Sequence, residues 1–175
     1  MVFSREQWDD VGEQSGGRAG TERENRNFSE KERNPVLVEF GSQSRNEGFA
    51  RMVAAAYVAQ FNPTMEEISD VKTAVSEAVT NAVIHGYRGE DGIIRMQMSR
   101  QGDEVTIEVS DYGEGIGNIL QAMEPMYTTR PDMERSGMGF AFMEAFMDEL
   151  EVYSSPGHGT VVRMKKKIAS PAPDE

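Results

Sequence analysis

The chain has 175 residues, a formal net charge of −12, twelve methionines and no cysteine. This length suits one compact domain with a hydrophobic core, and the methionines are best explained as core filling. The lack of cysteine excludes disulfides, cysteine-based zinc sites and thiol nucleophiles. A chain without disulfides fits a cytoplasmic protein. The acidic balance argues against direct nucleic-acid binding, because phosphate contacts need clustered Lys and Arg.

The two ends of the chain differ in composition from the middle. Residues 1–34 are rich in Glu, Arg, Gly, Ser and Asn, so we expect a disordered tail that cannot bury enough apolar surface to fold. Residues 169–175 are expected to form a second disordered tail. The sequence contains neither a secretory signal nor an apolar run of membrane-spanning length. The folded domain is therefore predicted at 35–168.

The first predicted elements are a strand at 36–40 and a helix that ends near residue 61. Ser44 is expected to cap this helix, with Glu47 at the third position after it. The apolar residues at helical spacing, which predict its buried stripe, are Phe49, Met52, Val53, Ala56, Tyr57 and Phe61. A second helix should begin near residue 64 and end at His85, with Gly86 as its C-terminal glycine.

The remaining segments complete the predicted fold. Apolar and polar residues alternate on both sides of a turn at 101–103, which predicts a hairpin. A loop with two prolines spans 118–135, and a helix at 140–148 and strands near 149–154 and 160–166 follow. This order predicts an α/β (α+β) two-layer sandwich, with helices on one face of a mixed, mainly antiparallel sheet.

Three polar residues recur every four positions on the second helix: Glu77, Asn81 and His85. This spacing places them on one stripe. The residues between them are apolar, so the stripe must face something polar. A carboxylate there suits a general base, and an amide oxygen suits a hard cation such as Mg²⁺. A solvated helix face explains the same pattern.

A second motif begins at Asp111, which is followed by Gly113, Gly115 and Gly117. An Asp at the end of a strand is a rigid acceptor suited to an exocyclic amine such as that of adenine. Glycines allow the backbone to approach a ring or a phosphate closely. Alternating glycines also mark ordinary tight turns.

The remaining candidate residues lie in loops. A glycine-rich loop meets a helix start at Ser136, Gly137, Met138 and Gly139, and the N–H groups of a helix start bind phosphate. An ordinary helix capped by Ser136 is the alternative. Hydroxyls and a guanidinium that could close over polyphosphate are supplied by Thr128, Thr129 and Arg130, unless this loop is simply exposed.

In this order the motifs resemble the GHKL nucleotide-binding fold, which gyrase-type ATPases, Hsp90, MutL proteins and histidine kinases share. The resemblance is closest to the bacterial anti-sigma factor serine kinases, in particular the anti-sigma F factors of endospore formers. It is carried by the segments NEGFAR (46–51), SEAVTNAVIHGY (76–87), ERSGMGF (134–140) and FMDE (146–149). It covers about residues 36–168 and leaves the N-terminal tail unexplained.

The resemblance implies roles for individual residues. Glu77 would be the general base on a protein serine, Asn81 would hold Mg²⁺, and Asp111 would receive the adenine amino group. Thr160 would support adenine, and Arg135 would add positive charge at the phosphates. The residues implied to form the ATP lid and phosphate loop are Thr128, Thr129, Arg130, Ser136, Gly137, Met138 and Gly139. Glu47 and Arg51 resemble the docking pair of the family, although spacing alone indicates only a surface ion pair.

The resemblance also implies partners. The chain is expected to be a homodimer that inhibits a sporulation sigma factor and, with ATP and Mg²⁺, phosphorylates an anti-anti-sigma factor. A general-stress anti-sigma kinase and a binding module that never transfers phosphate remain alternatives. A sensor kinase is disfavoured, because no phosphoacceptor histidine stands on a dimerisation helix.

Overall fold

The computed structural model describes residues 32–124, 126 and 137–168. The elements in chain order are β1 (Glu32–Gly41), α2 (Arg45–Val58), the 3₁₀ turn η1 (Ala59–Phe61), α3 (Met65–Asn81), the π-helical turn η2 (Ala82–Gly86), β2 (Ile93–Gln101), β3 (Glu104–Asp111), α4 (Ile119–Ala122), α5 (Gly139–Phe146), β4 (Glu149–Ser155) and β5 (Gly159–Lys167). β1 begins within the segment 1–34 that the sequence assigned to a tail. No helix in these described ranges has the length and apolarity needed to cross a membrane.

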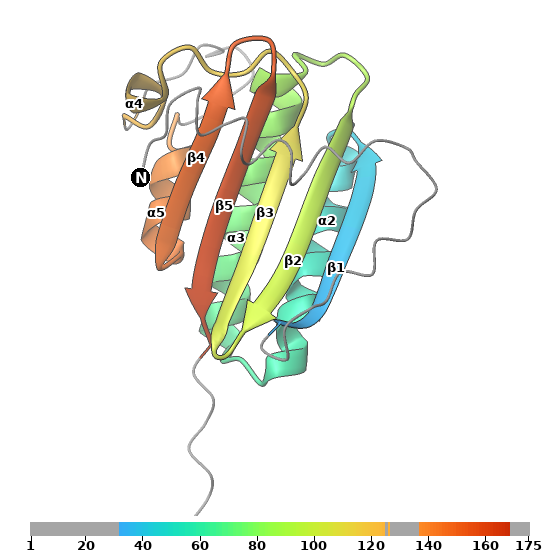
Figure 1. The fold of residues 1–175 in the computed structure, drawn as a ribbon, viewed down its shortest axis with the longest axis vertical. Coiled ribbons are helices and arrows are strands. Elements are labelled where there is room, and N and C mark those ends of the chain that lie inside the picture. The colour runs from blue at the N-terminus through green and yellow to red at the C-terminus, as the bar shows by residue number, and fades with distance from the viewer. Residues whose placement is uncertain (1–31, 125, 127–136, 169–175) are drawn as a thin grey trace, which may run out of the picture.

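The strands form one sheet in the order β1-β2-β3-β5-β4. Each neighbouring pair in this described sheet is antiparallel. The helices α2, α3 and α5 lie together on one face of the sheet (Figure 1). The predicted two-layer α/β fold is therefore confirmed, and its sheet is antiparallel throughout the described strands.

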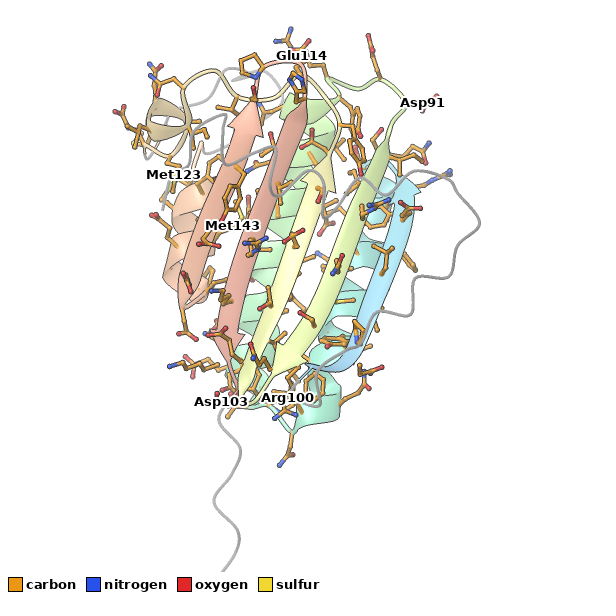
Figure 2. All side chains as sticks on the ribbon, viewed as in Figure 1. Asp91, Arg100, Asp103, Glu114, Met123 and Met143 are labelled. Carbon is orange, nitrogen blue, oxygen red and sulfur yellow. The ribbon has the colours of Figure 1, made fainter. Side chains whose placement is uncertain are left out.

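The core lies between the sheet and these three helices. Alternate residues of the central strands point into it, as the period-two pattern predicted. Four methionines, Met96, Met98, Met143 and Met164, are fully buried there, which fits their expected role as core filling. Met143, which is labelled in Figure 2, belongs to α5 and is fully buried in this core.

The apolar face of α2 differs from the predicted one. Its buried residues are Ala50, Ala54, Ala55, Tyr57 and Val58. Phe49 is 50% exposed and Met52 is 58% exposed, so the prediction that both belong to the buried stripe was wrong. Three of the five buried residues are alanines, and α2 packs against α3, whereas Phe49 and Met52 stay exposed.

The expected cap of α2 is also absent. Ser44 is the N-cap residue, but its side chain accepts no capping hydrogen bond and its backbone is already helical. The reciprocal capping box occurs instead at α3, where Thr64 accepts from the backbone N–H of Glu67 and the Glu67 carboxylate accepts from the Thr64 N–H. Glu47 therefore does not take part in a capping box with Ser44, although its position suggested one.

Candidate functional site

A cavity of about 320 Å³ opens where α3, the end of β3 and the start of α5 meet. Its volume falls at the small end of the range for ligand pockets. The residues that the sequence predicted and that line it are Asn81, His85, Asp111, Gly115, Gly117, Gly137, Gly139 and Thr160. Predicted residues outside the described ranges are Thr128, Thr129, Arg130, Arg135 and Ser136. The cavity therefore brings together residues that are far apart in sequence, such as Asn81, Asp111 and Thr160.

Asp111 ends β3 and is buried at this cavity. Its carboxylate accepts a hydrogen bond from the backbone N–H of Gly113 at 2.9 Å. Burial raises the pKa of Asp111 to about 6, against the backbone hydrogen bonds from Gly113 and Thr160, which lower it. A buried carboxylate with few partners is suited to accept hydrogen bonds from a ligand.

Glycines surround Asp111 because the backbone passes too close for side chains. A Cβ atom on Gly86 would lie 2.7 Å from the Asp111 carboxylate, and a Cβ on Gly113 would lie 2.0 Å from the Gly86 carbonyl oxygen. Gly86 does not have the left-handed backbone expected of a C-terminal glycine. Gly86 ends the helical segment, as predicted, but the close approach of Asp111 is the reason for a glycine at this position.

The helix before Gly86 also departs from the prediction. α3 ends at Asn81, and a π-helical turn carries the chain from Ala82 to Gly86. Such turns widen the backbone locally and occur frequently at functional sites. Asn81 and His85 both line the cavity, so the stripe predicted from α-helical spacing still faces it despite the wider turn.

Ser154 on β4 supports two residues of the opposite cavity wall, Ile116 and Thr160. Its hydroxyl accepts from the backbone N–H of Ile116 at 2.8 Å and donates to the Gly159 carbonyl at 2.8 Å. It also lies 2.9 Å from the Thr160 hydroxyl. These contacts fix the loop after Asp111 against the β4–β5 turn, so Thr160 and the glycine loop are positioned together.

The far end of the cavity is formed by α3 and the first residue of α5. A Cβ on Gly139 would lie 3.1 Å from the amide oxygen of Asn81 and 3.2 Å from a carboxylate oxygen of Glu77. Glu77 and Asn81 therefore meet beside the start of α5, as their spacing predicted. Gly137 has φ +61°, a conformation that favours glycine, and Met138 is the N-cap residue between the two glycines.

Sequence reasoning missed three residues at the rim. The Tyr87 hydroxyl accepts from the backbone N–H of Tyr112 at 2.9 Å and donates to the Ile93 carbonyl, which braces the end of β3. Arg88 and Glu114 form an ion pair and both line the cavity. Figure 2 shows Glu114 at the end of the sheet opposite Arg100 and Asp103. Glu114 stands inside the Asp-Gly motif, which was the available signal.

The predicted docking pair lies apart from the cavity. Glu47 and Arg51 occupy successive turns of α2 and form an ion pair of 3.3 Å. Neither residue lines the cavity.

The described residues fit a nucleotide better than a metal held by protein alone. The cavity has the buried Asp111 carboxylate at one end and the Asn81 amide beside Gly139 at the other. The Glu77 carboxylate lies near Gly139 but is not part of the cavity lining. Within the described ranges, no three His, Asp or Glu side chains are grouped to hold a metal. Asn81 could hold Mg²⁺ as one protein ligand, because Mg²⁺ is usually bound through few protein groups plus phosphate and water.

Comparison with known proteins defines the class to which this fold and cavity belong. Residues 42–166 match the family described as "Histidine kinase-like ATPase domain". The anti-sigma F factor of Clostridium beijerinckii is 61% identical over 136 residues, which cover 77% of this chain and 95% of that protein. The anti-sigma F factor of Thermoanaerobacter sp. (strain X514) is 57% identical over 137 residues, covering 78% and 96%.

A solved structure of the catalytic domain of histidine kinase ThkA also matches, with a TM-score of 0.49 and 16% identity, covering 76% of this chain and 96% of that chain. The chain belongs to the histidine kinase-like ATPase domain family, and within it to the anti-sigma F factors. The GHKL resemblance that the sequence motifs indicated is confirmed.

Proposed function

We propose that this protein is an ATP- and Mg²⁺-dependent anti-sigma factor that also phosphorylates a serine of an anti-anti-sigma protein. The observation that carries the proposal is the cavity that joins Asp111 at one end to Asn81 and Gly139 at the other, with the Glu77 carboxylate beside Gly139. The names of its relatives at 57–61% identity support the anti-sigma part. The expected sigma factor is the sporulation type, and the expected location is the cytoplasm.

The two ends of the cavity suggest the orientation of ATP. Asp111 would accept a hydrogen bond from the adenine amino group, and Thr160 would support the ring. Asn81 would contribute one ligand to Mg²⁺, which neutralises phosphate charge when bound. The N–H groups at 137–139 would bind phosphate, together with the loop residues Thr128, Thr129, Arg130, Arg135 and Ser136.

Glu77 is proposed as the general base. A serine oxygen of the substrate forms a bond to the γ-phosphorus while the bond from that phosphorus to the β–γ bridging oxygen breaks. The serine proton passes to the Glu77 carboxylate, and ADP leaves. Phosphoryl transfer depends mainly on positioning and charge stabilisation, so Glu77 has the one proton-transfer role in this scheme.

The test uses the purified full chain, radiolabelled ATP and the anti-anti-sigma protein. Labelled phosphoserine on that protein is expected, and Glu77→Ala should abolish it while ATP still binds. If wild-type protein binds ATP and the sigma factor but transfers no phosphate, the binding-only alternative replaces the kinase. If the chain instead binds and inhibits a general-stress sigma factor, that type replaces the sporulation type.

We also propose a homodimer formed along β1 and α2. β1 stands at the edge of the sheet, and exposed edges invite pairing with another strand. Leu37 on β1 and Phe49 and Met52 on α2 are large apolar side chains that are at least half exposed. A second copy would cover them, which explains why α2 keeps its larger apolar residues on the outer face.

A further inference from the structure

Glu47 reaches across from α2 to α3. The hydroxyl of Ser76 on α3 donates a hydrogen bond to Oε1 of Glu47. The ion pair with Arg51, at 3.3 Å, uses the same oxygen. Both contacts therefore converge on Oε1, and no described residue is hydrogen-bonded or ion-paired to Oε2.

This arrangement limits the freedom of a side chain that is otherwise mobile. A Glu on a helix surface samples many rotamers, and the loss of that freedom costs about 1–2 kcal/mol when it is ordered. Here a hydroxyl from a neighbouring helix and a guanidinium one turn along its own helix hold the carboxylate from two sides. The Glu47 side chain is 22% exposed and that of Arg51 is 46% exposed, so the pair is held at the surface and is not buried.

We propose that Ser76 is a positioning residue, which holds Glu47 so that Oε2 and the Arg51 guanidinium are presented together to a protein partner. The inference rests on the proposed function, in which the chain binds a sigma factor, and on the resemblance of Glu47 and Arg51 to the docking pair of the family. The partner surface that fits carries a Lys or Arg for Oε2 beside an Asp or Glu for Arg51.

Ser76 also connects this surface to the nucleotide cavity. It precedes Glu77 on α3, and Glu77 lies with Asn81 beside Gly139. A shift of α3 on nucleotide binding would therefore move the hydroxyl that holds Glu47. If nucleotide binding changes the affinity for the partner, partner binding must change the affinity for the nucleotide by the same factor.

The test compares Ser76→Ala with wild type in sigma-factor binding by calorimetry, with ATP present. Because a pre-ordered side chain removes about 0.5–1.5 kcal/mol of ordering cost, affinity should fall about two- to tenfold, while the affinity for ATP stays within twofold. Ser76→Thr keeps the hydroxyl and should restore binding. Thr73→Ala is the matched control, because its hydroxyl bonds within α3 to the Ser69 carbonyl, and it should leave partner affinity unchanged.

The outcomes separate the inference from the proposed function. If Glu47→Ala and Arg51→Ala weaken sigma-factor binding but Ser76→Ala does not, docking stands and the positioning role is wrong. If wild-type protein binds no sigma factor, the proposed function fails. In that case a urea double-mutant cycle of Ser76→Ala and Glu47→Ala still decides the contact. About fivefold coupling in the unfolding equilibrium supports it, and additive effects refute it.

Discussion

The Asp111 carboxylate and the backbone of Gly86 are so close that a single methyl group on Gly86 would lie 2.7 Å from a carboxylate oxygen. The end of η2 and the end of β3 meet at this point, where the Asp111 side chain packs against the backbone of Gly86. The same closeness keeps water from Asp111, and burial raises its pKa to about 6. Asp111, which we propose as the adenine-binding residue, therefore changes its protonation state near pH 6.

Protein stability should fall as pH rises from about 4 to about 6. In this pH window the folded protein keeps a proton on Asp111 that the unfolded chain has released. The stabilisation that is fully present below the ordinary pKa of 3.8 is therefore lost as the pH rises through the raised pKa. The loss attributable to Asp111 is up to about 3 kcal/mol. Urea denaturation at pH 4 and pH 7.5 measures it, and Asp111→Asn should remove this part of the pH dependence.

ATP affinity should change with pH in the opposite direction. If the ionised carboxylate is the form that accepts the adenine amino group, affinity falls about tenfold per pH unit below the Asp111 pKa of about 6. Calorimetry between pH 5 and pH 8 tests this. An unchanged affinity across that range would contradict the assignment of Asp111 to adenine.

Gly113→Ala should disrupt the site. Its Cβ would lie 2.0 Å from the Gly86 carbonyl oxygen, which is backbone and cannot rotate away. We expect a loss of at least about 2 kcal/mol of stability together with loss of ATP binding. The control is Gly102→Ala in the β2–β3 turn, where φ is +65° and no atom lies within 4 Å. It should cost about 1 kcal/mol through its backbone conformation and leave ATP binding intact.

Thr64→Ala and Ser44→Ala should have unequal effects. Thr64 caps α3 through a complete capping box, whereas the Ser44 side chain makes no capping hydrogen bond. Loss of the Thr64 cap should lower the free energy of unfolding by about 1 kcal/mol. Ser44→Ala should change it by less than about 0.5 kcal/mol. Equal losses in chemical denaturation would show that Ser44 caps α2 after all.

Tyr57→Phe should stabilise the protein. The Tyr57 hydroxyl is buried in the described structure without a hydrogen-bond partner, and removal of such a group recovers about 1 kcal/mol. Tyr87→Phe is the opposite control, because the Tyr87 hydroxyl bonds the backbone of both Tyr112 and Ile93. It should lower the melting temperature, and a fall for Tyr57→Phe as well would indicate that its hydroxyl is satisfied.

The proposed dimer should dissociate when Phe49 is replaced by Glu. The new charge would be buried against a second copy at the β1 and α2 surface. Light scattering coupled to size-exclusion chromatography should give the mass of one chain for Phe49→Glu and of two for wild type. Met65→Glu alters an even more exposed apolar residue at the start of α3 and should remain dimeric.

The sequence by itself determined the features that depend on neighbours along the chain. Alternation predicted the β2–β3 hairpin, and helical spacing predicted that Asn81 and His85 face the same cavity. The Asp111 motif marked a place where backbone must approach closely. Each of these follows from the fixed geometry of strands and helices, so a short window of residues suffices.

Only the tertiary structure decided which groups meet across elements. Apolar residues of α2 are both buried and exposed, and tertiary packing buried Tyr57 and Val58 with the alanines while Phe49 and Met52 stayed exposed. Gly86 ends its helical segment, but the tertiary structure shows that the nearby Asp111 carboxylate also requires a glycine there. Glu47 was expected to cap its own helix and instead accepts from Ser76 on another. The free energies of burial and contact that decide these cases depend on residues far away in the chain, which local patterns do not contain.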